Sequence, residues 1–242
     1  MSTHGVTREQ LAMCSVLMSR QAARHPLALT RTPHTLDKVL ASTQVSPVTN
    51  LLECARRADG GAAIVVASSR FLKQNGIKKP AARVLGGGEG SGPLYPPPVI
   101  DEDMFSCEEA CRTAYHASQL SADNIDFFGL YDCYPICLVR AVEAVGICAP
   151  GHGGQWMEEM YERTTSEYEQ AAFPVNTHGG LLAFGAPWEV PAMYNIIEAF
   201  AQLTGRADQR QIPNATRALV YGNGGVFSAS AVAILEACSS AP

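Results

Sequence analysis

One apolar run limits what the first third of this chain can fold into. Residues 62–67 read AAIVVA and contain no polar or charged side chain, with glycines before them and serines after them. Such a run is typical of a strand that a sheet buries on both faces. Residues 1–80 contain no second run of comparable strength, and a single strand cannot form a sheet. These residues are therefore expected to be the end of a domain whose other strands lie outside this sequence.

Beyond residue 80, strand patterns alternate with helix patterns, which is typical of an α/β fold. Strands are expected at 127–130, 217–221 and 226–235, and GNGG at 222–225 predicts a tight turn between the last two. Apolar residues at helical spacing predict helices over residues 7–24, 35–41, 50–58, 106–120, 135–145 and 191–204. Thr7 and Gln10 have the spacing of a capping box at the start of the first of these helices. A more polar helix is expected to begin near His152.

Three local signals complete this assignment. The glycine run at 86–92 lacks the Gly-Lys-Ser/Thr ending of a phosphate loop, so it is predicted to be a surface loop or a domain junction. Asp132 is placed to cap the helix at 135–145. The helix at 191–204 is expected to turn its apolar residues inward, namely Met193, Ile196, Ile197, Phe200 and Leu203. We divide the chain into an incomplete part, residues 1–80, and a complete C-terminal domain, residues 81–242.

Composition and charge exclude several classes of protein. The net charge is −5, so the basic footprint of a nucleic-acid-binding protein is missing. No apolar run approaches the roughly 20 residues of a membrane-spanning helix, and the N-terminus lacks the apolar core of a signal peptide. We expect a cytoplasmic protein without a membrane span.

The 8 cysteines do not have the spacing of a zinc site. Cys107 and Cys111 are separated by one helical turn, as are Cys133 and Cys137, and neither pair is a Cys-x-x-Cys clip. Free thiols that are mostly buried are the expected state. No metal site is predicted.

The stretch FPVNTHGGLLAFGAP at residues 173–187 is the candidate for a functional loop. Asn176 and His178 supply hydrogen-bonding groups beside Gly179 and Gly180, and glycine lets a backbone approach a ligand closely. A polar loop that leads into a helix N-terminus suits a polar or anionic group. A structural loop, with the histidine bonded to backbone, has the same pattern and stays open as an alternative.

Several segments of the sequence form a recognisable series: GVTREQLA at 5–12, DGGAAIVVAS at 59–68, YDCY at 131–134, NTHGG at 176–180 and QLTG at 202–205. In this order they resemble the thiolase superfamily, especially the sterol-carrier-protein-type thiolases and the thiolase-like acyl-CoA lyases. The resemblance implies two βαβαβαββ halves stacked as a five-layer α-β-α-β-α sandwich, usually in a dimer. The predicted fold is therefore an α/β, thiolase-like layered α-β-α sandwich, with one complete C-terminal half plus the tail of the N-terminal half.

The sequence departs from the thiolase pattern at the catalytic positions. The family's nucleophilic cysteine lies in the half that precedes these residues, and its Gly-His-Pro base motif is replaced by Gly185-Ala186-Pro187. The family often carries a second cysteine where this chain has VYGN at 220–223. The sterol-carrier-type His-Asp-Cys-Phe is replaced by YDCY at 131–134, which is similar to thiolase-like aldol lyases that cleave side-chain acyl-CoAs with a small OB-fold partner.

The resemblance implies an enzyme, an acetyl-CoA acyltransferase or an acyl-CoA aldol lyase, that needs the missing N-terminal half. Its catalytic candidates are Tyr131, His178 and Tyr221, and its substrate-binding candidates are Asp132, Asn176, Gly179, Gly180, Gly222, Asn223 and Gly224. Coenzyme A thioester is the expected substrate, with no bound cofactor. A homodimer is expected, or a hetero-complex with an OB-fold protein or the missing half.

Two alternatives stay open. Tyr131 and Tyr221 have the pattern of strand-end aromatics whose hydroxyls bond to backbone. The chain as a whole would then be a non-catalytic thiolase-like half that binds acyl-CoA or scaffolds a partner subunit.

Overall fold

A computed structural model describes residues 4–238, apart from 93–104, 167–172, 189 and 226. Its centre is a four-stranded sheet in the order β3 (Ala81–Ser91), β6 (Ala229–Cys238), β5 (Arg217–Gly224) and β4 (Phe127–Gly129). β6 runs antiparallel to both of its neighbours, whereas β4 and β5 are parallel. The predicted α/β class and the strands that begin near residues 127, 217 and 226 are confirmed.

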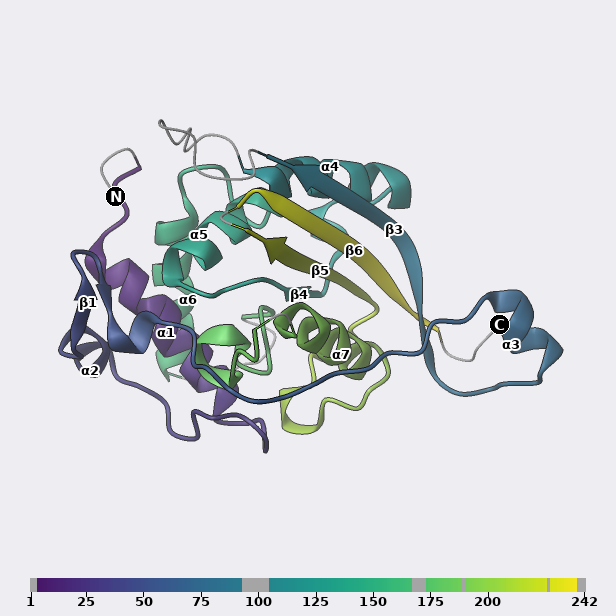
Figure 1. Ribbon diagram of the computed structural model, residues 1–242, viewed down its shortest axis with the longest axis horizontal. Helices are drawn as coiled ribbons and strands as arrows, with labels where there is room; N and C mark the ends of the chain where they lie inside the picture. Colours follow the sequence, from purple (N-terminus) through teal and green to yellow (C-terminus); the bar gives the residue numbers. More distant parts are fainter. Residues whose placement is uncertain (1–3, 93–104, 167–172, 189, 226, 239–242) are drawn as a thin grey trace.

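Helices cover both faces of this sheet. α4 (Ser106–Ser118) and α5 (Pro135–Ala144) lie on one face, and α7 (Pro191–Leu203) lies on the other (Figure 1). α1 (Arg8–Ala22) and α6 (Gly153–Ser166) pack beside α5. Short 3-10 turns, η2 (Ala122–Asn124) and η5 (Asp208–Arg210), precede β4 and β5. The result is the predicted α-β-α layering.

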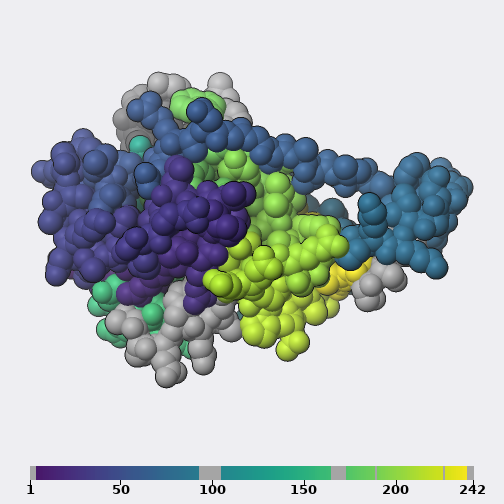
Figure 2. Space-filling model, turned by 90° about the horizontal axis from the view of Figure 1, so that it is seen from below, coloured from purple at the N-terminus to yellow at the C-terminus, as the bar shows by residue number. Residues whose placement is uncertain are grey.

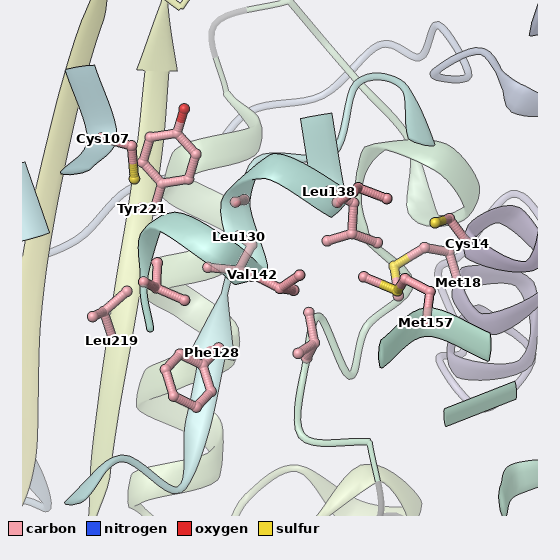
Figure 3. Packing of buried hydrophobic residues seen from close by; sticks show 14 of the residues in the cluster. Cys14, Met18, Cys107, Phe128, Leu130, Leu138, Val142, Met157, Leu219 and Tyr221 are labelled. Atoms are coloured by element: carbon pink, nitrogen blue, oxygen red, sulfur yellow. The ribbon is translucent and has the colours of Figure 1, made fainter. Parts of the chain in front are cut away.

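The main hydrophobic core lies between the sheet and the helices on the α4 side. Figure 3 shows it running from Leu219 on β5 through Leu130 and Leu138 to Met18 on α1 and Met157 on α6. A second, smaller cluster packs under α7. Because α1 contributes to the main core, the first helix of the chain belongs structurally with the C-terminal domain.

The first third of the chain matches the expected pattern only in part. Thr7 and Gln10 form the predicted capping box of α1, and α2 (Leu36–Leu40) begins after Thr35 as expected. The predicted helix at 50–58 is wrong. The hairpin strands β1 (Gln44–Ser46) and β2 (Thr49–Asn50) are followed instead by a single 3-10 turn, η1 (Leu51–Glu53). The Glu53 carboxylate accepts from the Asn50 amide at 2.7 Å and pairs with Arg8 at 2.5 Å, which fixes this turn against α1.

The predicted buried strand at 62–67 is not formed. These residues belong to no strand, and Val65 and Val66 are 97% and 81% exposed. The segment runs away from the body to α3 (Ser69–Gln74), which stands apart in Figures 1 and 2. A strand needs backbone partners on its flanks, and no described segment of the chain supplies one beside it.

The glycine run at 86–92 is not a loop, because most of it lies within β3. Its alternate glycines face α4. A Cβ atom at Gly86, Gly88 or Gly90 would lie 2.7, 2.0 or 2.0 Å from the backbone oxygens of Ala114, Ala110 and Ser106. The run therefore allows α4 to lie directly on the strand, and the small residues Ala110 and Ala114 of that helix lie at the contact.

Two further expectations are corrected at the C-terminal end. The predicted turn at 222–225 is largely strand, since Gly222, Asn223 and Gly224 pair with Ala231, Ser230 and Ala229. The chain reverses between Gly225, at φ +63°, and β6. The hairpin is therefore longer than the sequence pattern indicated.

α7 begins at Pro191 as predicted, but its buried face is only partly the expected one. Its buried residues include Asn195, Glu198 and Gln202, whereas Ile197 is 40% exposed. Of the residues expected inside, Leu203 is buried and Ile196 packs against the smaller cluster. Glu198 and Gln202 belong to a hydrogen-bonded network, whereas the side-chain oxygen and nitrogen of Asn195 are buried without a hydrogen-bond partner.

The contact between β3 and α4 gives a direct test. Gly88→Ala places a methyl group 2.0 Å from the Ala110 oxygen, so it should lower the free energy of unfolding by about 1–3 kcal/mol or more. Gly87→Ala is the matched control, because its Cβ meets only the Val232 oxygen at 3.5 Å, which is an ordinary contact. Urea denaturation of both variants measures the difference. Equal stabilities would contradict the role assigned to the alternate glycines.

The exposed segment at 62–67 predicts that this chain is not self-sufficient. Covering a valine side chain gains about 1.5–3 kcal/mol, so exposed Val65 and Val66 favour association. Size-exclusion chromatography should show a dimer, a hetero-complex or an aggregate. Replacing both valines by aspartate should reduce the fraction of associated protein. Val48→Asp, at another exposed valine, is the control. A well-folded monomer with a sharp two-state melt would count strongly against this prediction.

Candidate functional site

The candidate site lies where β4 ends, because the loop at 173–187 is locked onto that end by Asn176. The Asn176 side chain accepts from the Leu130 amide at 2.7 Å and donates to the Leu130 oxygen at 2.8 Å. Its own amide donates to the Phe128 oxygen at 3.0 Å. The loop therefore continues the pairing of the sheet beyond β4. These contacts give Asn176 a structural task, and its role toward substrate stays a prediction.

Asp132 makes the second connection between the same two segments. Its buried carboxylate accepts from the Leu181 amide at 2.7 Å and from the Leu182 amide at 3.4 Å. It thus holds the start of the π-helical turn η4 (Gly180–Phe184), and the predicted cap on α5 is wrong. Burial raises the pKa of Asp132 to about 7, against the opposing effect of the two amides. A carboxyl group with this pKa changes its charge near neutral pH.

Gly179 and Gly180 permit the close contacts of this turn. A Cβ atom at Gly180 would lie 2.1 Å from an oxygen of Asp132, and one at Gly179 would lie 2.5 Å from the Ala22 side chain. Both glycines have positive φ, at +109° and +60°. They therefore set the backbone path, and a contact with substrate stays a prediction for each of them.

His178 is a buried, neutral histidine. Burial is the largest cause that lowers its pKa to about 4, and nearby His25 and Arg210 act in the same direction against Glu198. Its ring packs edge-to-face on Phe184 with centroids 5.2 Å apart, and its Nδ1 atom has no hydrogen-bond partner. The side chain can thus donate or accept one further hydrogen bond without carrying charge.

A buried ionic network supports this histidine, and the sequence patterns did not predict it. Glu198 accepts from Thr177 Oγ1 at 2.7 Å and pairs with Arg210 through Nε and Nη2, both at 3.0 Å. Gln202 Nε2 donates to Thr177 Oγ1 at 2.9 Å. Burial raises the pKa of Glu198, but Arg210, His178 and Thr177 more than offset it and leave it below its usual value. The sequence did contain a signal for this network, because Asn195, Glu198 and Gln202 recur at helical spacing on α7. The apolar residues of the same helix form a stronger pattern.

The side chains of Tyr221 and Asn223 are joined by a hydrogen bond. The Tyr221 hydroxyl donates to Asn223 Oδ1 at 3.2 Å, and Asn223 Nδ2 donates to the Gly225 oxygen at 3.1 Å. The Tyr221 ring lies edge-to-face with Phe105, and burial raises the pKa of its hydroxyl. Asn223, Gly222 and Gly224 also lie within the β5–β6 ladder. The hydrogen-bond partner of Tyr221 is a side chain, whereas the structural alternative expected backbone, and both that alternative and the catalytic role stay predictions.

Tyr131 lies between the two residues that join β4 to the loop, Leu130 and Asp132. It follows Leu130, which is bonded to Asn176, and precedes Asp132, which is bonded to Leu181. Its side chain is half-buried and packs against the main core. β4 and β5 run parallel, and Gly129, the last residue of β4, lies opposite Val220. Tyr131 therefore follows β4 on the side of the sheet where β5 also ends. The structure thus brings the backbone around Tyr131 against the loop that carries His178.

An open depression of about 540 Å³ is lined by residues 57–60 and 186–188. Ala186, at the position of the family's histidine base, lines it, and the Ala186 amide donates to the Arg56 oxygen at 2.7 Å. Arg57 contributes a positive charge to the same wall. The predicted catalytic and binding residues do not line this depression.

The described residues contain neither a cluster that could hold a metal ion nor a helix that could span a membrane. No group of three or more His, Cys, Asp or Glu side chains in them is placed to hold a metal ion. Within the same residues, no helix has the length and apolar character needed to cross a membrane.

Comparison with known proteins identifies the family. The family model described as "Thiolase C-terminal domain-like" matches residues 101–237. The acetyl-CoA acetyltransferase of Methanothermobacter thermautotrophicus is 30% identical over 236 residues, which cover 98% of this chain and 60% of that protein. This chain therefore belongs to the thiolase family, as its sequence segments indicated.

Other relatives give the range of named activities. Benzoylsuccinyl-CoA thiolase subunit BbsB of Thauera aromatica is 28% identical, over 91% of this chain and 56% of its own length. The solved structure named "Ltp2-ChsH2(DUF35) aldolase" has a TM-score of 0.82 at 25% identity, over 98% of this chain and 60% of that one. A monomeric SCP2-thiolase-like protein of Mycobacterium smegmatis shares the fold, with a TM-score of 0.67 and 18% identity. The chain spans about 60% or less of the length of these relatives.

The burial of His178 predicts a pH dependence of stability. The folded chain binds a proton at His178 only near pH 4, whereas the unfolded chain does so near 6.5. The stability that neutral His178 contributes is therefore complete above pH 6.5 and is lost, by about 3 kcal/mol, as the pH drops toward 4. His25, whose pKa is also lowered, acts in the same direction, and Asp132, whose pKa is raised, acts in the opposite direction. His178→Gln should flatten this fall.

Melting temperatures measured between pH 7 and pH 4 test this expectation. His116→Gln, at an exposed histidine of α4, is the matched control and should leave the slope unchanged. Parallel curves for wild type and His178→Gln would show that His178 is protonated in the folded state after all.

Proposed function

We propose that this chain is the C-terminal part of a thiolase-like enzyme that cleaves a carbon–carbon bond in an acyl-CoA by a retro-aldol reaction. The proposal is carried by two features that occur together in this chain. Tyr131 is held at the end of β4 by the bonds of its neighbours, and Ala186 stands in place of the family's histidine base. Thiolysis needs a nucleophile and a base to activate it. A retro-aldol step forms no acyl-enzyme, so it does not need the histidine that activates the thiolase nucleophile.

The reaction begins with a 3-hydroxyacyl-CoA. A base removes the hydroxyl proton, the bond between the α and β carbons breaks, and the β carbon becomes a ketone or an aldehyde. The electron pair passes to the α carbon as the enolate of the shortened thioester, which an acid then protonates. Each carbon, proton and electron pair is accounted for without a redox cofactor, and coenzyme A thioester is both substrate and product.

Tyr131 is the proposed proton-transfer group. A tyrosine hydroxyl ordinarily has a pKa of about 10, so it serves best as the acid that protonates the enolate, or as a base with help from its neighbours. The proposed role of His178 is to donate a hydrogen bond to the thioester oxygen, since its imidazole stays neutral. Asp132, whose pKa is about 7, holds the turn that carries His178 and changes charge in the working pH range.

The enzyme is proposed to work as a complex. The exposed apolar segment at 62–67 suits pairing with a sheet edge, either that of the family's N-terminal half or that of a second copy of this chain. The similar aldolase has two components in its name, and BbsB is called a subunit. A small OB-fold protein is the further partner implied by the resemblance, and its binding to this chain is part of the proposal.

A second candidate function is a non-catalytic half that binds acyl-CoA or scaffolds a partner. The hydrogen bond between Tyr221 and Asn223 favours it, because a hydroxyl engaged in structure is less available for chemistry. Binding of an acyl-CoA by the complex, without turnover of any 3-hydroxyacyl-CoA, would distinguish this function from the first.

Tyr131→Phe tests the retro-aldol proposal. Removing one positioned acid–base group costs about 10²–10⁴-fold in kcat, so the variant should lose cleavage of 3-hydroxyacyl-CoAs in the assembled complex. Tyr134→Phe, at an exposed neighbouring tyrosine, is the matched control and should retain activity. Circular dichroism should show both variants folded.

The same complex should be a poor thiolase. Ala186→His should not restore thiolysis of acetoacetyl-CoA unless a nucleophile is also present, because the histidine alone forms no acyl-enzyme. Robust thiolysis by the wild type that is insensitive to Tyr131→Phe would overturn the proposal and return the chain to ordinary thiolases.

A further inference from the structure

Two cysteine thiols meet beside Tyr131 and Asp132. Cys133 Sγ and Cys137 Sγ are 3.4 Å apart. Cys137 is on the first turn of α5, whereas Cys133 precedes the helix and lies in a bend of the chain. A disulfide needs about 2.05 Å between the sulfurs, so closing this pair requires a movement of little more than an ångström. The non-helical backbone at Cys133 is free of the helix ladder and can make that movement.

The chain contains a second pair that serves as an internal comparison. Cys107 and Cys111 are also four residues apart, with sulfurs 3.7 Å apart, but both lie within α4 and are fully buried. The pKa of Cys107 is raised, chiefly through its hydrogen bond with Cys111 and by burial. A thiol in this state is a poor nucleophile and is closed to reagents in solvent.

The surroundings of Cys133 differ on each of these points. Cys133 is half-buried, and its neighbours Tyr134 and Ile136 are 46% and 40% exposed, so small reagents reach this turn. The contact with the Cys137 thiol is the largest cause that lowers the pKa of Cys133, and it raises the pKa of Cys137. Because Cys133 is half-buried and Cys137 is buried, Cys133 is the sulfur that a reagent in solvent reaches first, and Cys137 is its shielded partner.

We propose that Cys133 and Cys137 form a redox-active dithiol, a modification site at which peroxides or small disulfides produce an intramolecular disulfide. With hydrogen peroxide, the Cys133 thiolate attacks one oxygen and the other leaves as hydroxide, giving a sulfenic acid. Cys137 sulfur then displaces the sulfenic hydroxyl, and its proton leaves with that oxygen as water. The two thiols lose two electrons and two protons, which reduce the peroxide to two waters.

Closing this disulfide displaces the segment that carries Tyr131. The Cys133 oxygen accepts from the Ala55 amide at 3.0 Å, and Asp132 holds the η4 turn through two amides. A shift of Cys133 toward Cys137 pulls on both connections. Oxidation is therefore expected to alter the loop around Tyr131, and this consequence is independent of which reaction the site performs.

Thiol labelling and mass spectrometry of the full chain test the dithiol. The reduced chain is treated with a short pulse of iodoacetamide at pH 7, and Cys133 should be alkylated at least about tenfold faster than Cys107 or Cys111. After mild hydrogen peroxide, the chain should lose two hydrogens in mass, and peptide mapping should place the bond between Cys133 and Cys137.

Variants make the test specific. In Cys137→Ser, oxidised glutathione should leave a stable mixed disulfide on Cys133, because the sulfur that would release the glutathione is gone. Cys111→Ser is the matched control and should still form the disulfide. Alkylation of Cys133 no faster than Cys107, or oxidation that joins Cys133 to Cys54 instead, would overturn the proposal.

Discussion

The candidate site depends on two side chains that join the end of β4 to a distant loop. Asn176 pairs with both backbone groups of Leu130, and Asp132 accepts the first amides of η4. Each bond uses a buried side chain to satisfy a backbone group that would otherwise be unpaired away from water. Tyr131 lies between Leu130 and Asp132, so these bonds fix its backbone. The glycines at 179 and 180 are the sterically necessary counterpart of the same contacts.

Burial decides the protonation states around this site. It keeps His178 neutral and raises the pKa of Asp132 to about 7, while Arg210 and the neighbouring polar groups keep Glu198 charged. A neutral histidine donor and a carboxyl group that titrates near neutral pH suit proton transfer and enolate stabilisation better than they suit nucleophilic attack. The thiol of Cys133 is the nucleophile of this region, and its partner is another thiol.

Some apolar side chains of the chain are left exposed to solvent. The segment at 62–67 lies exposed beyond the sheet, and Ile197 on the outer face of α7 is partly exposed as well. Figure 2 shows this segment extending from the body to the isolated α3. The chain also spans about 60% or less of the length of its relatives. An extended apolar segment with no pairing strand and a helix with outward apolar residues are what a further layer of protein would cover.

The sequence by itself determined the family and the α/β class, because hydrophobic periodicity, proline and glycine signals and short motifs act over a few residues. It predicted the capping box of α1 and the starts of α5 and α7 for the same reason. Only the tertiary structure decided the rest. The strand character of residues 86–91 depends on their pairing with β6, which lies far away in the sequence, and the state of residues 62–67 depends on partner strands.

The roles of single polar residues were likewise decided by the fold. Asp132 stands three residues before α5 and has the sequence pattern of its cap, yet its carboxylate is used 49 residues away at Leu181. The inward face of α7 carries a charged side chain because Thr177 and Arg210, which lie outside this helix, meet Glu198 in the folded chain. Local patterns carry no information about which distant group satisfies a buried charge, and that pairing exists only once the layers have packed.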